Sequence, residues 1–173
     1  MKEAPSHEGA FFVCVCQRKE KRQMELRKLE ELFYQENAHL VEVMDKNAAG
    51  KWSDNKTRGY GIVVIEAGGL KFGIPLRSGI RHDQAFMTAP GTDKGLDYSK
   101  AVLLLKDEYI SGIAFKIPNV EFVRIKEKSH RITVEFSKYV ERYKKGIATA
   151  DRNILRGYKY STLQNYHKEL GLA

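Results

Sequence analysis

Two segments with a β-type pattern, residues 62–67 and 70–77, flank the pair Gly68-Gly69. In the second segment apolar side chains occupy every other position, which places them on one face of a strand. Two consecutive glycines suit a primed two-residue turn, because both central residues of that turn need positive φ. The pattern therefore predicts a β-hairpin. Its second strand is expected to stop at Pro75, which cannot donate a hydrogen bond to a neighbouring strand.

Weaker patterns lie on the N-terminal side of the hairpin. Residues 25–29 (ELRKL) predict a short strand. Residues 30–44 predict an amphipathic helix, because apolar side chains recur there at helical spacing. The polar residues 46–58 predict a loop that leads into the hairpin.

Beyond the hairpin the chain first loses its periodicity and then regains it. Residues 83–97 contain Pro90-Gly91 and predict a long loop. The apolar runs at residues 98–105 and 110–117 then predict two short strands.

The C-terminal third has helical periodicity. A long helix is expected to begin near Pro118 or Glu121 and to end near Gly146. A last helix is expected over residues 161–171, with Ser161 as its N-cap. Together these elements predict an α+β fold, in which a twisted antiparallel sheet is flanked by about four helices.

Composition narrows the class of protein. The chain has 173 residues, of which 42% are hydrophobic, so it fits one domain with a real core. Its formal net charge is +8, which favours a polyanionic partner because each neutralised phosphate releases condensed counterions. A basic protein that carries this charge for solubility alone remains an open alternative.

A group of hydrogen-bond donors follows the predicted second strand, in the order Arg77, Ser78, Arg81 and His82. No carboxylate lies among them, so this strand end favours an anion. Ser78 can bond a phosphate oxygen, the two arginines can clamp it, and the imidazole of His82 can carry a proton near neutral pH. Each has an ordinary alternative: a turn cap for Ser78, a packed or capping ring for His82, and a solvated rim for the arginines.

The cysteines, the histidines and one apolar run indicate in which compartment the protein resides and whether it needs a cofactor. Cys14 and Cys16 are spaced too closely for a mutual disulfide and favour a reducing compartment. The apolar run at residues 10–16 is too short to cross a bilayer and lacks the flanks of a signal peptide. The five histidines lack ligand spacing, and no phosphate-binding glycine motif occurs. We therefore expect a cytoplasmic protein without a metal, cofactor or membrane partner.

Four segments carry a resemblance to a known family: TRGYGIVVIE, LKFGIPLRSGIRH, KGLDYSKAVLL and NYHKELGL. In this order and spacing they resemble the TenpN toxins of bacterial type III toxin-antitoxin systems, which are related to ToxN and AbiQ. The similarity begins near Met24. It implies one endoribonuclease toxin domain over residues 24–173 with a ToxN-like, SH3-barrel-related sheet. We expect residues 1–23 to be a disordered extension, and a misplaced start is the alternative.

The resemblance also implies roles for individual residues. Ser78 stands where the relatives carry a serine after a Pro-Leu pair, and Arg58 lies near their basic catalytic residue. The catalytic set implied is Ser78, Arg58, His82 and Arg81. The ToxN branch has lysine near the positions of Arg58 and His82, so both are departures, and an arginine is a poor proton donor. Arg58 can also be a solvated surface side chain.

A wider set of residues is expected to bind RNA: Lys56, Tyr60, Lys71, Arg77, Lys128, His130 and Arg131. Tyr60 can stack on a base, because single-stranded RNA is commonly read by aromatic rings. The basic cluster at residues 128–131 can line an RNA groove. The alternatives are a tyrosine that packs in the core and a helix face that is only solvated.

In such a family the enzyme cleaves RNA without a metal, by attack of the 2′-hydroxyl, and leaves a 2′,3′-cyclic phosphate. The resemblance implies a cognate RNA antitoxin pseudoknot that blocks the site and assembles with several toxin copies, often in defence against phage. The competing hypothesis is a basic RNA-binding module without catalysis. A metal-dependent nuclease is a third possibility.

Overall fold

The computed structural model describes residues 24–44 and 61–172. In chain order its elements are β1 (Glu25–Leu29), α1 (Glu31–Glu36), β2 (Gly61–Ala67), β3 (Leu70–Arg77), β4 (Ala85–Met87), β5 (Gly95–Asp97), η1 (Tyr98–Lys100), β6 (Val102–Leu103), η2 (Asp107–Tyr109), β7 (Ile110–Ala114), α2 (Asn119–Glu127), α3 (Ser129–Ala148), α4 (Arg152–Arg156) and η3 (Thr162–Asn165), where η marks a 3-10 turn.

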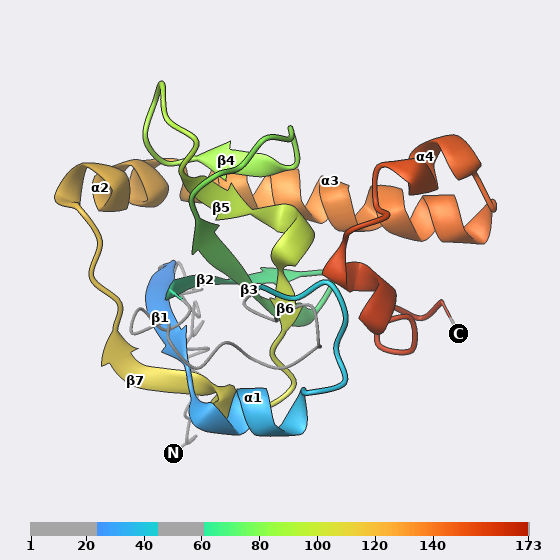
Figure 1. Ribbon diagram of the computed structural model, residues 1–173, viewed down its shortest axis with the longest axis horizontal. Coiled ribbons are helices and arrows are strands. Elements are labelled where there is room, and N and C mark those ends of the chain that lie inside the picture. The colour runs from blue at the N-terminus through green and yellow to red at the C-terminus, as the bar shows by residue number, and fades with distance from the viewer. Residues whose placement is uncertain (1–23, 45–60, 173) are drawn as a thin grey trace, which may run out of the picture.

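The strands form one seven-stranded antiparallel sheet, in the order β4-β5-β3-β2-β1-β7, with β6 paired to β3 off this path. The α+β prediction is confirmed at this level, and the described part of the chain contains four α-helices. β3 is the central strand, because it pairs with β2 along one edge and with β6 and then β5 along the other (Figure 1).

The predicted hairpin is confirmed, with Gly68 at φ 59° and Gly69 at φ 78°. The predicted strand end at Pro75 is wrong, since β3 continues to Arg77. Along an antiparallel hairpin, hydrogen-bonded and non-hydrogen-bonded residue pairs alternate, starting from the pair that flanks the turn. By this count the cross-strand pair of Ile62 with Pro75 is a non-hydrogen-bonded one. The missing N–H of Pro75 therefore points to the other edge, where β3 changes its partner from β6 to β5.

Several other boundaries differ from the predicted ones. The strand at residues 25–29 is confirmed, whereas the helix predicted over 30–44 ends at Glu36. The Asn37 side chain bonds the carbonyl of Phe33 at 2.9 Å, and asparagine is a poor helix former, so the chain turns here. The predicted loop at 83–97 contains β4 and β5, whose three residues each are too few to show a period.

The later elements are shorter than expected. Of the two predicted apolar strands, the first divides into η1 and β6 and the second ends at Ala114. The single long helix is wrong, because the chain breaks at Lys128 into α2 and α3. The last helix is only a 3-10 turn, η3, although Ser161 caps it by accepting from the Leu163 N–H at 3.2 Å.

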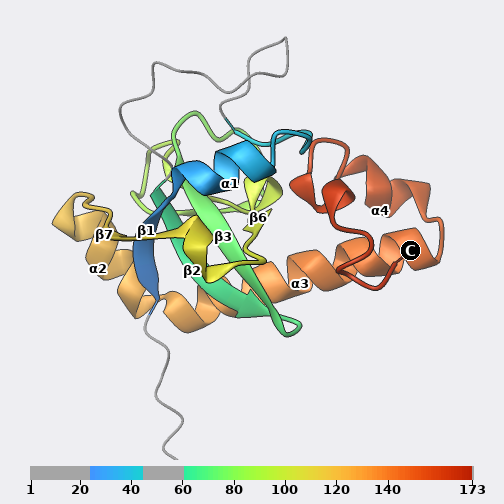
Figure 2. The same cartoon turned by 90° about the horizontal axis from the view of Figure 1, so that it is seen from below.

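The sheet lies between helices. α1 and α3 lie on opposite faces of it in both views (Figures 1 and 2). On the α3 side Phe72 meets Phe136 edge to face, with ring centroids 5.1 Å apart. The other face is also covered, since Gly73 and Pro75 are buried there. None of the helices among residues 24–44 and 61–172 is long and apolar enough to span a bilayer.

α2 holds the outer hairpin in place. The Arg124 Nε donates to the carbonyl of Met87 at 3.0 Å, and its guanidinium lies over the Phe86 ring. The hydroxyl of Thr88 donates to Glu121 at 2.5 Å. This outer hairpin is therefore held at two places: β5 pairs with β3 in the sheet, and β4 contacts α2.

Candidate functional site

The turn after β3, residues 78–82, is anchored at one apolar side chain. Ile80 is buried, and its N–H donates to the carbonyl of Asp93 at 3.0 Å. Gly79, with φ 76°, allows the chain to bend directly before this anchor. Ser78 and Arg81 are consequently exposed.

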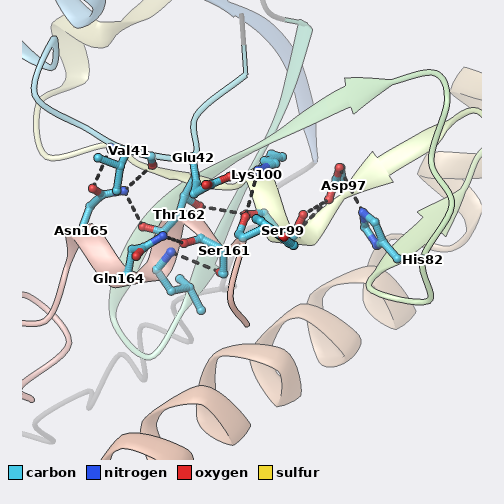
Figure 3. Close-up of polar contacts among 12 residues, drawn as sticks. Val41, Glu42, His82, Asp97, Ser99, Lys100, Ser161, Thr162, Gln164 and Asn165 are labelled. Atoms are coloured by element: carbon cyan, nitrogen blue, oxygen red, sulfur yellow. Dashed lines mark hydrogen bonds and ion pairs between the residues drawn. The ribbon is translucent and has the colours of Figure 1, made fainter. Parts of the chain in front are cut away.

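A buried carboxylate stands behind this turn. Asp97, the last residue of β5, has no exposed surface. Its Oδ2 lies 2.8 Å from Nη1 of Arg77. The same oxygen lies 3.4 Å from Nε2 of His82 (Figure 3). Arg77 is the cross-strand partner of Gly95, so Asp97 is its diagonal neighbour on the same face of the sheet.

The second carboxylate oxygen is bonded within the chain itself. Oδ1 of Asp97 accepts from the backbone N–H of Ser99 at 3.0 Å and from its hydroxyl at 2.6 Å. Arg77, His82, Asp97 and Ser99 form what we call the Asp97 cluster. The side chains of Arg77 and His82 are 36% and 37% exposed, so both extend from a buried negative charge to solvent. A carboxylate buried this deeply needs such partners.

Four predicted site residues are therefore neighbours at one end of β3: Arg77, Ser78, Arg81 and His82. Ser78 and Arg81 form no side-chain hydrogen bond or ion pair with another described residue. Both are thus open to a ligand. The arrangement exposes a hydroxyl, two guanidinium groups and an imidazole along one short turn.

Other predicted residues lie elsewhere. Lys71 is at the opposite end of β3 and pairs with Asp107, so the structure does not bring it to the turn. Lys128 and His130 are exposed at the junction of α2 and α3. Arg131 pairs with Glu135 at 2.6 Å, one helical turn later.

The predicted roles of Lys56, Arg58 and Tyr60 concern residues outside the described part of the chain, as does the extension predicted for residues 1–23.

An open cavity of about 460 Å³ lies beside the Asp97 cluster, and we call it the α3 cavity. Its walls come from the loop after His82, from η1, from α3 and from the segment around α4. The lining residues are Asp83, Gln84, Ala85, Tyr98, Arg131, Glu135, Lys138, Tyr139, Arg142, Asn153, Ile154, Gly157 and Tyr158. Asp83 and Tyr98 each directly follow a member of the Asp97 cluster, whereas Ser78 and Arg81 do not line the cavity.

The tyrosines of the cavity stay protonated. The Tyr98 hydroxyl donates to Glu135 at 3.0 Å, and burial together with that carboxylate raises its pKa far above the usual range. Burial also raises the pKa of Tyr158 to about 12, and the charge of Arg142 opposes that rise. These rings therefore contribute apolar surface and fixed hydrogen bonds rather than charge.

Two features escaped the sequence reasoning. Asp97 falls at the end of the predicted loop at residues 83–97, and the only local signal is a serine two residues later, a pattern typical of many turns. Lys138 and Arg142 look like ordinary helix surface cations until α4 and the 83–85 segment are placed opposite them.

In the described part of the chain, no group of three or more His, Cys, Asp or Glu side chains is placed to hold a metal ion. The exposed basic side chains next to Ser78 are instead suited to a phosphate group. Comparisons with protein-family models, with curated proteins and with solved structures found no match.

Proposed function

We propose that the protein is a metal-independent endoribonuclease, the toxin of a type III toxin-antitoxin system of the TenpN kind, with a ToxN-like fold. The four sequence segments support the family, and one structural observation supports the chemistry. Ser78 is exposed at a strand end where Arg77 and His82 both contact Asp97. A phosphodiester placed at Ser78 would have cations and an imidazole within one turn of chain.

In the proposed reaction the 2′-oxygen of RNA bonds to phosphorus and the bond from phosphorus to the 5′-oxygen breaks. The 2′-hydroxyl loses a proton and the departing 5′-oxygen gains one, which leaves a 2′,3′-cyclic phosphate and a 5′-hydroxyl. Negative charge accumulates on the phosphorus oxygens at the crowded intermediate. Ser78 and the guanidinium groups of Arg77 and Arg81 supply hydrogen bonds to that charge.

His82 is the candidate for proton transfer. Its Nε2 faces the carboxylate of Asp97, which leaves Nδ1 for the substrate. A carboxylate behind an imidazole orients the ring and fixes its tautomer. Asp97 itself has no exposed surface, so it acts as a positioning residue and does not touch RNA.

Cleavage in the presence of EDTA tests this function. We expect the purified protein to cut RNA in EDTA and to leave cyclic phosphate ends. Ser78→Ala should reduce the cleavage rate on the order of 10²-fold to 10³-fold, as expected for loss of one hydrogen bond to the transition state, while RNA binding persists. Ser137→Ala, on α3 and outside the α3 cavity, is the matched control and should cleave like the wild type.

The other outcomes each favour a rival function. Binding without cleavage by the wild type under any condition supports the non-catalytic RNA-binding module. Cleavage that EDTA abolishes supports a metal-dependent nuclease.

The proposed partner is an RNA antitoxin. Short tandem repeats directly upstream of the gene are expected, and their transcript should co-purify with the protein in a higher-order complex and inhibit cleavage. A gene without such repeats would contradict the toxin-antitoxin assignment while leaving the nuclease activity to be judged by the EDTA assay.

A further inference from the structure

The α3 cavity has a volume typical of small-ligand sites and is built from two kinds of side chain. Tyr98, Tyr139 and Tyr158 are buried, so they form its base. Lys138 and Arg142 are exposed and stand at its opening. The cavity therefore offers an aromatic surface below and positive charge above.

The two cations have no carboxylate partner in the described part of the chain. Lys138 and Arg142 form no ion pair with any residue in the described ranges, whereas the charge of Arg131 is taken by Glu135. They lie one turn apart on the same face of α3, about 6 Å along the helix axis. That separation allows both side chains to contact one phosphate group.

Two of the tyrosine hydroxyls already donate their protons within the fold. The Tyr139 hydroxyl donates to Ser161 at 2.8 Å, and the Tyr158 hydroxyl donates to the carbonyl of Tyr139 at 2.8 Å. Their rings lie 4.7 Å apart at an interplanar angle of 33°. With Ile154 they present a surface for a flat apolar group, and a nucleobase is the flat group that accompanies a phosphate in RNA.

The rim supplies the polar groups that a nucleoside needs. Asp83 forms no ion pair among the described residues and can accept a hydrogen bond from a ribose hydroxyl or a base amino group. Asn153 can donate and accept on the α4 side. The Gln84 side chain donates to the carbonyl of Gly157 at 2.6 Å and ties the two sides of the rim together.

We propose that the α3 cavity binds one nucleoside monophosphate unit, with the base on the tyrosine surface and the phosphate between Lys138 and Arg142. If the function proposed above holds, this unit is a nucleotide of the RNA strand next to the linkage at Ser78. The placement follows from the chain itself, because Asp83 and Tyr98 line the cavity and directly follow His82 and Asp97.

Binding measured by calorimetry tests this site. The probes are AMP and a short single-stranded oligoribonucleotide, and the protein carries Ser78→Ala so that the strand is not cut. Adding Lys138→Ala and Arg142→Ala together should weaken binding of the oligoribonucleotide at least about tenfold. The slope of log affinity against log salt should fall by about 0.7 for each lost contact. Lys145→Ala, which removes a charge from the same helix outside the cavity, should change neither quantity.

The two probes separate the two sources of the ligand. Tighter binding of the oligoribonucleotide than of AMP assigns the unit to an RNA strand, and equal binding assigns it to a free nucleotide. Unchanged affinity in the double variant overturns the site, as does an equal loss in Lys145→Ala. Failure of the nuclease proposal looks different: the wild type then cuts no RNA in EDTA, whatever the cavity binds.

Discussion

Asp97 shows how one side chain can serve both the fold and the site. A carboxylate without exposed surface is stable only if it is paired and hydrogen-bonded, and here Arg77 supplies the opposite charge and Ser99 the hydrogen bonds. His82 approaches the same oxygen as Arg77, so the position of two exposed basic groups depends on one buried anion. At the scale of the residue, the charge of Asp97 is therefore the feature to alter.

We predict that Asp97→Asn slows RNA cleavage on the order of tenfold to hundredfold, the range known for loss of the hydrogen-bond partner behind a metal-bound histidine. The amide keeps the shape and can still accept from Ser99, but it no longer attracts Arg77 and His82. A positioning role predicts a lower kcat in a variant that still folds and still binds RNA, so urea unfolding and RNA affinity are measured beside the rate. The control is Asp93→Asn in the same region, whose side chain is exposed. A folded Asp97→Asn variant that cleaves RNA at the wild-type rate would contradict the positioning role.

At the scale of the element, the β2–β3 hairpin carries the site at its end. Its turn contains two glycines with positive φ, and an added Cβ at either would meet no atom within 4 Å. Any cost of substitution there is therefore conformational rather than steric. β3 can still reach Arg77 because its proline falls where the strand changes partners.

We predict that Gly68→Val lowers the free energy of unfolding by about 1 to 2 kcal/mol, because a β-branched residue resists the left-handed conformation. Gly68→Asn should cost much less, since asparagine tolerates that conformation. Urea unfolding of both variants measures the difference. Equal losses of stability in the two variants would mean that the cost comes from contacts of the new side chain and not from the positive φ of residue 68.

A second element-scale feature joins α1 to η2. Glu36 accepts from the Lys106 ammonium group at 2.6 Å and from the Tyr109 hydroxyl at 2.5 Å. The hydrogen bond from Lys106, followed by that from Tyr109, lowers the pKa of Glu36. The folded chain therefore holds the charged form to lower pH than the unfolded chain does.

This contribution to stability is complete above the ordinary glutamate pKa of about 4.3 and disappears as the pH falls through the lowered pKa of the folded state. We predict that the stability difference between the wild type and Glu36→Gln is constant near neutral pH and shrinks below about pH 4.3. Urea unfolding at a series of pH values measures it. Glu127→Gln, at a residue with no ion pair in the described ranges, should show no such dependence, and a difference that grows with acidity would contradict the assignment.

At the scale of the whole molecule, the C-terminal segment closes the structure around η1. The Thr162 hydroxyl bonds the carbonyls of Ser99 and Ala101, and the side chain of Asn165 exchanges two hydrogen bonds with the backbone of Val41 (Figure 3). Leu163 is fully buried between these contacts. Because Ser99 belongs to the Asp97 cluster, this distant segment supports the site.

We predict that Leu163→Ala lowers the free energy of unfolding by about 2 to 5 kcal/mol, the usual cost of a large cavity in a core. Thermal or urea unfolding measures it, and Gln164→Ala, at an exposed neighbour, should have little effect. Similar losses in both variants would show that the segment is held by its backbone contacts rather than by Leu163.

The sequence predicts those features that depend on neighbours in the chain. The hairpin follows from alternation and two glycines, the strand at residues 25–29 from a short pattern, and the cap at Ser161 from a bond to a residue two positions on. The exposed donors after β3 also follow, because they adjoin a strand that the pattern already defines. Local geometry is sufficient for each of these.

Only the tertiary structure decides the rest, because it depends on contacts between distant segments. β4 and β5 are stable as strands through their pairing with each other and with β3 and through the contacts of Arg124, none of which a three-residue pattern can show. Asp97 can hold the basic side chains only because Arg77 lies on the neighbouring strand β3, 20 residues earlier in the chain. The α3 cavity exists because α4 and the 83–85 segment face one side of α3. The helical periodicity of the sequence does not predict which side of α3 they face.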